Sequence, residues 1–409
     1  MIAMHLVRSM LVRVILVCAM GAPLAMGAPR KESQLSEKEI ADGWILLFDG
    51  QSTFGWQSTS DADWKIDGGV LSARKGAPGW LRTTSEFGDY LLSVEFRKQA
   101  DTNSGIFLRM NAEPRDPTRD CYEINIAAAG ASPFATGSLV GRQKAAPAPE
   151  DDQWHHLEAQ ALAGDITIKI DGQHVIAYHD PKPLARGVIG LQFKEGPIEF
   201  RSVKLKPLAL RSIFNGKDLS GWKVYPGKQS VFAVTPEGAL RVTSGPGQLE
   251  CAATYGDFIL QLEVFSGGKH LNSGIFFRSI PGEFAQGYES QIHNGYRDGD
   301  RTRPIDCGTG GFYRRQNARK VVADDFRWFA KTLVVSGNHM AAWVDGYQVS
   351  DWTDTRADHE NPRKGSRRAA GTLSLQGHDP TTNLSFRKIR AAEMPARESN
   401  GAANTISPP

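Results

Sequence analysis

The sequence is poor in cysteine, has little net charge and lacks long apolar runs. Its 409 residues include four cysteines. Outside the first 27 residues these are Cys121, Cys251 and Cys307. None of the three has the spacing of a metal finger or a redox pair, so we interpret them as partly buried thiols. The formal net charge is +3, and the short basic cluster at residues 363–368 is interpreted as a solvated loop. These features predict neither a nucleic-acid partner nor a membrane span.

The start of the chain has the pattern of an export signal. Arg8 and Arg13 supply positive charge, residues 14–20 form a short apolar core, and small residues at 25–27 resemble a cleavage site. The apolar core is too short to cross a bilayer comfortably. We therefore predict a signal peptide over residues 1–27, which implies export to the periplasm or to the medium.

An internal duplication organises the rest of the sequence. Several short motifs recur in the same order at an offset of roughly 166 to 186 residues. The recurring pairs are Phe48-Asp49-Gly50 with Phe214-Asn215-Gly216, Trp56 with Trp222, residues 103–109 with 272–278, Tyr122-Glu123 with Tyr288-Glu289, and Asp171-Gly172 with Asp345-Gly346. A repeat of this length predicts two whole domains rather than a solenoid.

The predicted division of the chain follows from this repeat. After the signal peptide we expect a linker at residues 28–41 with a short helix near its end. The first domain is expected at residues 42–208 and the second at 210–394. The tail at 395–409 is rich in Pro, Ala, Ser and Asn, a composition typical of disorder.

Each copy reads as a series of short strands. Apolar and polar residues alternate in segments such as 90–97 and 165–170, as expected for strands with one buried face. Asp171-Gly172 and Asp345-Gly346 lie between alternating segments, which is a strong β-hairpin signal. The predicted fold class is all-β, with two tandem antiparallel sandwiches.

The richest polar pattern lies in the second copy, at residues 287–294. Side chains of a strand alternate between its two faces, so Glu289, Gln291 and His293 should share one face. On the preceding strand, at residues 272–278, the same alternation places Phe276 with Arg278. If these strands pair, the combined face suits a sugar-like ligand. The alternative is an ordinary solvated sheet face held by ion pairs.

The motifs together resemble the 3-keto-disaccharide hydrolase domain family. The resemblance rests on Leu-Phe-Asp-Gly followed by Gly-Trp, on Asn-Ser-Gly-Ile-Phe-x-Arg, on the Tyr-Glu strand, on Thr-Gly-x-x-Tyr and on a closing Phe-Arg strand. It covers nearly all of both copies. It implies a concanavalin A-like jelly-roll sandwich and cleavage of 3-keto-glycosides by hydrolysis or by elimination and hydration. The positions that match in the second copy are Arg278, Tyr288, Glu289, Gln291 and Tyr313.

The first copy matches the family less fully. It keeps Arg109, Tyr122 and Glu123, but has Asn125 in place of Gln291, Ala127 in place of His293 and Val140 in place of Tyr313. Loss of the imidazole and the phenol removes two groups that could transfer protons. We therefore expect Arg109, Glu123 and Asn125 to bind ligand without catalysis, or the first domain to serve as a structural partner.

The expected chemistry assigns roles to the residues of the second copy. A ketone at sugar carbon 3 acidifies the hydrogen on carbon 2, so cleavage needs a base, an oxyanion partner and an acid for the leaving oxygen. Arg278 is predicted to bind the oxyanion, and Glu289 or His293 to act as the base. Tyr313 is predicted as the proton donor. Gln291, Phe276 and Asn294 are predicted to contact the sugar.

Other interpretations remain open at this stage. Arg278 and Glu289 could form a cross-strand salt bridge, and Gln291 could bind a loop backbone instead of a sugar hydroxyl. No cofactor is expected. A hard cation held by His293, Asp298, Asp300 and Asp306 is conceivable, although their irregular spacing favours simple loop decoration. The second functional class is a non-catalytic carbohydrate-binding or surface-assembly protein.

Overall fold

The structure, a computed structural model, is almost entirely β. It describes residues 33–116, 118–127, 130, 132–146 and 152–396. The predicted signal peptide and most of the predicted tail lie outside these residues. The single helix among them, α1 (Glu37–Ala41), begins at Ser36, whose side chain and that of Glu39 cap each other's backbone N–H groups. No helix in the described segments is long and apolar enough to cross a membrane.

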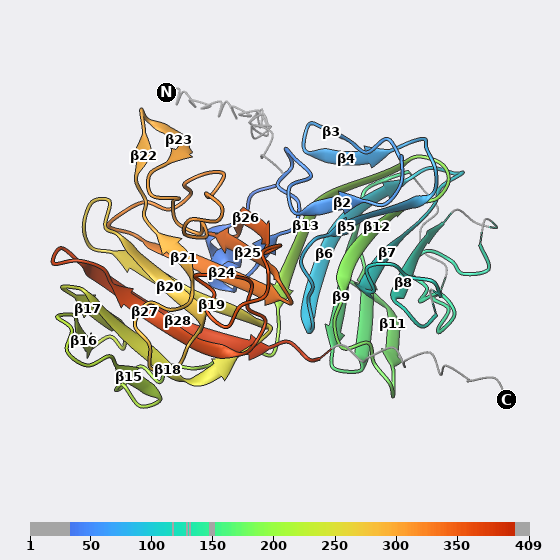
Figure 1. Cartoon of the computed structure of the whole chain (residues 1–409). Helices are drawn as coiled ribbons and strands as arrows, with labels where there is room; N and C mark the ends of the chain where they lie inside the picture. The colour runs from blue at the N-terminus through green and yellow to red at the C-terminus, as the bar shows by residue number, and fades with distance from the viewer. Residues whose placement is uncertain (1–32, 117, 128–129, 131, 147–151, 397–409) are drawn as a thin grey trace, which may run out of the picture. The chain divides into compact units, whose positions relative to one another are not determined.

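The first copy forms two antiparallel sheets (Figure 1). The large sheet has the order β11-β10-β9-β6-β13-β4-β3, with β1 paired to β13, and the small sheet has the order β2-β5-β12-β7-β8. The strand bounds are β1 (Ile45–Leu46), β2 (Trp56–Ser58), β3 (Lys65–Asp67), β4 (Val70–Ala73), β5 (Gly79–Thr83), β6 (Tyr90–Lys98), β7 (Asn103–Met110), β8 (Tyr122–Ala127), β9 (His155–Leu162), β10 (Asp165–Ile170), β11 (Gln173–His179), β12 (Val188–Phe193) and β13 (Ile198–Pro207).

The second copy repeats this topology. Its large sheet has the order β16-β17-β28-β19-β24-β25-β26, with β14 paired to β28, and its small sheet has the order β15-β18-β27-β20-β21. The bounds are β14 (Arg211–Ser212), β15 (Trp222–Val224), β16 (Val231–Val234), β17 (Leu240–Thr243), β18 (Gly247–Tyr255), β19 (Phe258–Ser266), β20 (Ser273–Ser279), β21 (Tyr288–Ile292), β22 (Tyr296–Arg297), β23 (Asp300–Pro304), β24 (Trp328–Ser336), β25 (His339–Val344), β26 (Tyr347–Thr353), β27 (Gly371–Gly377) and β28 (Asn383–Glu393).

The predicted all-β fold and its duplication are confirmed. Asp171-Gly172 joins β10 to β11, and Asp345-Gly346 joins β25 to β26. All four residues have positive φ, between 46° and 79°, as a hairpin turn that matches the strand twist requires. The three cysteines outside the N-terminal segment form no disulfide among the described residues and are at least partly buried, as the sequence predicts.

Each sandwich encloses apolar side chains between its two sheets. In the second copy, Leu249 and Ile275 of the small sheet belong to one buried cluster with Val264 and Leu333 of the large sheet. Inward side chains of the two sheets therefore fill the space between them, as in other face-to-face sandwiches. The outer face of the small sheet is left to polar side chains, and the candidate site lies there.

Candidate functional site

The outer face of the second small sheet carries two rows of side chains. Glu289 lies opposite Phe276, and Phe276 lies opposite Ser374. One step along, Gln291 lies opposite Gly274. The alternate residues of β21 point inwards, since Tyr288 and Ile292 belong to the apolar core. The strand alternation therefore correctly predicts that Glu289 and Gln291 share the face of Phe276.

Glu289 is the buried acid of this face. Its side chain is 6% exposed, and its Oε2 accepts a hydrogen bond of 2.9 Å from Nη2 of Arg363. Burial raises the pKa of the Glu289 carboxyl, although the Arg363 cation opposes this shift. The carboxyl therefore binds a proton at a higher pH than an ordinary glutamate does.

Tyr313 and Arg363 complete the surroundings of Glu289. The backbone N–H of Tyr313 donates to the Glu289 carbonyl over 3.0 Å. The Arg363 guanidinium lies 5.1 Å from the ring centre of Phe276 and 5.5 Å from that of Tyr313. Glu289, Tyr313 and Arg363 line one small hollow together with Arg315. The site thus combines an acid, a cation and a phenol.

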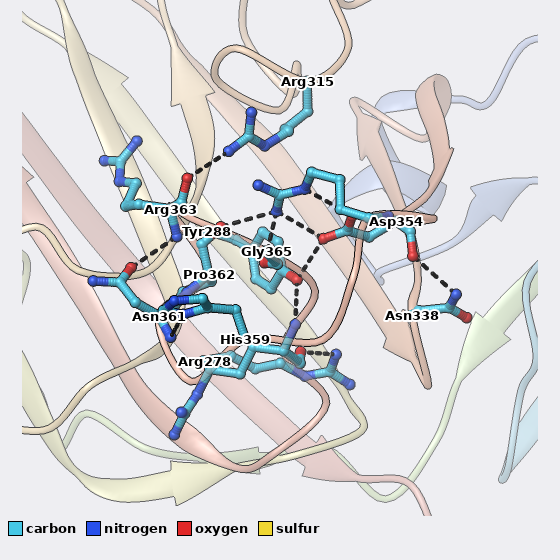
Figure 2. Close-up of polar contacts among 12 residues, drawn as sticks. Arg278, Tyr288, Arg315, Asn338, Asp354, His359, Asn361, Pro362, Arg363 and Gly365 are labelled. Atoms are coloured by element: carbon cyan, nitrogen blue, oxygen red, sulfur yellow. Dashed lines mark hydrogen bonds and ion pairs between the residues drawn. The ribbon is translucent and has the colours of Figure 1, made fainter.

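The loop between β26 and β27 positions Arg363 through a polar network, shown in Figure 2. Asp354 accepts hydrogen bonds from the Tyr288 hydroxyl at 2.7 Å and from Arg356 at 2.8 and 2.9 Å. Arg356 also donates to the carbonyl of Gly365. The backbone of Arg363 is held by Arg315 and by Asn361. These bonds fix a long loop over the small sheet.

Arg363 is the site residue that the sequence interpretation misses. It lies in the basic cluster interpreted as a solvated loop, and 74 positions separate it from Glu289. No local pattern signals such a contact, because only the path of the loop brings the two together.

Gln291 and His293 form the other part of the face. Gln291 is fully buried and donates through Nε2 to Asn272 at 3.0 Å and to Asp306 at 2.8 Å. Its Oε1 is buried without a hydrogen-bond partner among the described residues. A buried acceptor left unsatisfied in this way is rare and indicates a water or ligand position.

His293 lies at the end of β21. Its ring stacks on that of His270 with centres 6.1 Å apart, and its Nδ1 accepts a hydrogen bond from the N–H of Gly295. Burial lowers the pKa of His293, with Asp306 opposing and His270 supporting the shift. The imidazole is therefore largely neutral near pH 7, and because its Nδ1 accepts from Gly295, its proton lies on Nε2. By contrast, Asn294 is bound to Asp325 and Thr309, so its side chain secures the loops.

Arg278 does not join this face, contrary to the sequence-based prediction. It has a φ of 45°, and the register between β20 and β27 shifts between Phe276 and Ser279. This bulge re-aims the side chain. The fully buried guanidinium donates to the carbonyls of Gly256, Gly337 and Arg367 and to Asp257 at 2.7 Å. It therefore anchors three loops, and the suggested Arg278–Glu289 salt bridge is also wrong.

Arg109 repeats this arrangement in the first copy. Its φ is 46°, it is 1% exposed, and it donates to the carbonyls of Gly88, Ala163 and Leu184 and to Asp89. Because Arg109 and Arg278 have the same geometry in the two copies, we infer that both have the same structural role. Arg109 is thus not placed to contact a ligand beside Glu123.

The first copy keeps the buried acid as Glu123, but the residues around it differ. Glu123 lies opposite Phe107, and burial raises the pKa of Glu123 to about 7, with Lys194 opposing the shift. Asn125 donates to the carbonyl of Phe134, which commits its amide to a loop. Val140 takes the place of Tyr313, since its N–H donates to the Glu123 carbonyl.

The suggested cation site is not assembled. Within the described ranges, no three His, Cys, Asp or Glu side chains gather closely enough to hold a metal ion. Asp298 pairs with Arg303, and Asp300 binds Thr302. The remaining candidates, His293 and Asp306, lie on the face already described.

Several solved structures are similar to part of this chain. No curated protein matches the chain. One similar solved structure is a Parabacteroides distasonis protein provisionally described as a glycosyl hydrolase, with 16% identity, a TM-score of 0.39, and coverage of 43% of this chain and 99% of that one. A second such protein from the same organism has 22% identity, a TM-score of 0.35, and coverage of 40% and 99%. The carbohydrate-binding module CBM66 of Bacillus subtilis has 16% identity, a TM-score of 0.28, and coverage of 37% and 95%.

A family model matches most of the chain. The 3-keto-alpha-glucoside-1,2-lyase-like domain matches twice, at residues 43–206 and 209–392. Each match spans one sandwich with its two sheets. The chain therefore belongs to the 3-keto-alpha-glucoside-1,2-lyase-like domain family and carries two copies of that domain in tandem.

Proposed function

We propose that this chain is an exported enzyme that cleaves 3-keto-glycosides on the small-sheet face of its second sandwich. The observation that carries the proposal is Glu289, a buried carboxyl with a raised pKa that lies beside Arg363 and Tyr313. Perturbed acids in a polar hollow are typical of proton-transfer sites. Family membership supports carbohydrate as the substrate class.

The mechanism begins with proton abstraction. Glu289 takes the proton from carbon 2, the C–H bond breaks, and its electron pair forms an enolate with charge on the oxygen at carbon 3. Arg363 is the cation paired with Glu289, and we assign it the oxyanion role first expected of Arg278. The bond from carbon 1 to the glycosidic oxygen then breaks, and that oxygen leaves with the electron pair and gains a proton. Water adds to the resulting enone and restores the 3-keto sugar.

His293 and Tyr313 are the candidates for the second proton transfer. Glu289 and His293 are four residues apart along a strand, which separates them by about 13 Å. They therefore act on different atoms of the substrate, with Gln291 and its unpaired Oε1 between them. Tyr313 lies on the Glu289 side of the site. We assign the leaving-group proton to His293 or Tyr313, and sugar contacts to Gln291 and Phe276.

The second candidate function is carbohydrate binding without turnover. The ion pair of Glu289 with Arg363 favours it, because a paired carboxylate is a weaker base. The two functions differ in one assay, in which the protein is incubated with an aryl 3-keto-glucoside and with the unoxidised glucoside. The enzyme releases aglycone from the keto sugar alone, whereas a binding protein holds both sugars and releases nothing.

Substitutions test the assignment of the base. We expect Glu289→Gln to lower kcat by roughly a hundredfold or more, the usual contribution of a positioned base. Glu123→Gln, the matched change in the first copy, should leave kcat unchanged. Full turnover of the 3-keto-glucoside by both Glu289→Gln and His293→Ala would remove both residues from the mechanism.

The pH profile provides an independent check. A base acts only when deprotonated, so kcat/KM should fall as the pH falls through the pKa of Glu289. Because burial raises this pKa, the acidic limb should lie above the value of about 4.5 that an exposed glutamate shows. The residual activity of Glu289→Gln should lack this limb, and a limb that persists unchanged would assign it to another group.

A further inference from the structure

A second hollow lies away from Glu289, where the first small sheet meets the second sandwich. Its volume is about 380 Å³, within the range of small-molecule sites. Arg82 and Val188, on β5 and β12, line it together with the turn of residues 336–339 between β24 and β25. All of these residues belong to one compact unit of the chain.

Contacts across the hollow hold its two sides together. Ser336 donates to Glu86 over 2.6 Å, and Thr84 donates to Asp351 over 2.7 Å. Arg186, whose side chain is 8% exposed, pairs with Asp257 at 2.7 Å. The hollow is therefore a built feature with fixed walls.

The lining carries an excess of positive charge. It contains Arg82, Arg186 and Arg368, against a single carboxylate, Glu86. Glu86 already accepts a hydrogen bond from Ser336 and lies 3.4 Å from Arg186. Its negative charge is thus taken up within the wall, which leaves the other two arginines to attract an anion.

Arg82 indicates where the anion would bind. Its Nη2 donates to Gln57 over 3.1 Å, whereas its Nη1 is buried with no hydrogen-bond partner among the described residues. A buried guanidinium N–H without an acceptor is energetically costly. A carboxylate at this position would satisfy it, and arginine suits carboxylates because its donors form a planar fork.

The second copy shows that this charge is specific to the first. In the first copy, the residue after Trp56 on β2 pairs with Arg82 on β5. In the second copy, the residue after Trp222 on β15 pairs with Glu250 on β18, so Glu250 is the counterpart of Arg82. Glu250 accepts from the N–H of Gly282, so a loop occupies that position. In the first copy, Arg82 pairs on its other side with Gly190 of β12, which has no side chain to cover it.

We propose that this hollow binds an acidic monosaccharide, with its carboxylate on Arg82 and Arg368. The side-chain amides of Gln57 and Asn338 line the same space and offer hydrogen bonds to sugar hydroxyls. The volume fits one sugar ring and its carboxylate. This site is separate from Glu289 and needs no turnover.

Titration calorimetry of the full chain with glucuronate, glucose and inorganic phosphate tests the proposal. We expect glucuronate to bind and the other two to bind at least tenfold more weakly, since each lacks either the charge or the ring. Equal binding of glucose would refute the role of the arginines. Equal binding of phosphate would refute recognition of the sugar ring.

Substitutions locate the binding. Arg82→Gln should weaken glucuronate binding by about tenfold or more, as loss of a charged hydrogen bond predicts. Arg368→Gln, at an exposed position, provides a second test that does not depend on the fold tolerating the first. Arg74→Gln, an exposed arginine paired with Glu199, is the matched control and should bind normally. Unchanged binding in both Arg82→Gln and Arg368→Gln would overturn the proposal.

One further variant separates this inference from the proposed function. Glu289→Gln should bind glucuronate as the unaltered chain does, whatever its effect on turnover of 3-keto-glucosides. Loss of glucuronate binding in Glu289→Gln would move the ligand to the second sandwich and reject the hollow as its site.

Discussion

Lys331 is a lysine inside the second sandwich, where the first copy has a leucine. It lies opposite Leu262 and Val344, as Leu157 lies opposite Val94 and Ile170. Its Nζ donates to the carbonyls of Ser290 and Gln291 at 2.9 and 2.8 Å. The lysine thus binds the back of the strand that presents Glu289 and Gln291.

The pH dependence of stability should report on Lys331. Burial lowers its pKa from 10.5 to about 7 in the folded chain, so between these values the unfolded chain binds more protons. Stability therefore rises with pH across this window. From about pH 7 to 9.5 we expect a gain of up to about 3 kcal/mol, which Lys331→Met should lack in chemical denaturation. Lys38→Met, at an exposed position, should keep the gain, and equal curves for all three proteins would contradict the prediction.

Single residues show what strand periodicity can and cannot predict. Alternation correctly places Glu289, Gln291 and Phe276 on one face, because the period of a strand depends only on local geometry. It fails at Arg278, because the bulge near that residue breaks the period. Strand periodicity could not predict the contact of Arg363 with Glu289, because Arg363 lies on a long loop. The catalytic roles of these residues stay predictions.

The bulged strands β7 and β20 act as anchors at the level of whole elements. The second-last residue of each is an arginine of positive φ whose guanidinium binds two or more loop carbonyls and one aspartate. The sequence motif Asn-Ser-Gly-Ile-Phe-x-Arg therefore encodes a joint between strands and loops. The prediction of a catalytic role for Arg278 therefore misinterprets a residue that holds strands and loops together.

Substitution of Arg278 tests the joint. Arg278→Gln leaves Asp257 and several carbonyls short of a buried partner, so we expect a loss of about 3 to 5 kcal/mol in the free energy of unfolding. Activity per folded molecule should change little. Urea denaturation and active-site titration separate the two quantities. Lost turnover with unchanged stability would return Arg278 to the catalytic site.

Elements with local signals were predictable, and loops were not. The hairpins at Asp171-Gly172 and Asp345-Gly346 follow from turn chemistry, and the short helix before the first sandwich follows from its capping residues. The loop that contains Asp354 and Arg356 depends on contacts with Tyr288 and Gly365. Such contacts join distant parts of the chain and leave no periodic trace.

At the level of the whole molecule, the duplication predicts two sandwiches but not how they share a core. The apolar cluster of the first copy includes five residues of the second, Ile259, Val334, Ala341, Trp343 and Met394. Trp343 is 1% exposed, contacts Phe87 and donates to the carbonyl of Leu46 over 2.8 Å. The two copies are therefore expected to stabilise each other.

Calorimetry of the full chain tests this shared core. Because the cluster around Trp343 spans both copies, we expect one cooperative thermal transition rather than two. Trp343→Ala should remove about 3 to 5 kcal/mol, the usual loss for a large buried aromatic side chain, and should split the transition as the copies uncouple. Trp343→Phe keeps most of the packing and loses mainly the hydrogen bond to Leu46, so it should retain a single transition with a smaller decrease in Tm. Two well-separated transitions in the unaltered chain would show that the copies fold independently, and Trp343 would then stabilise only the sandwich that contains it.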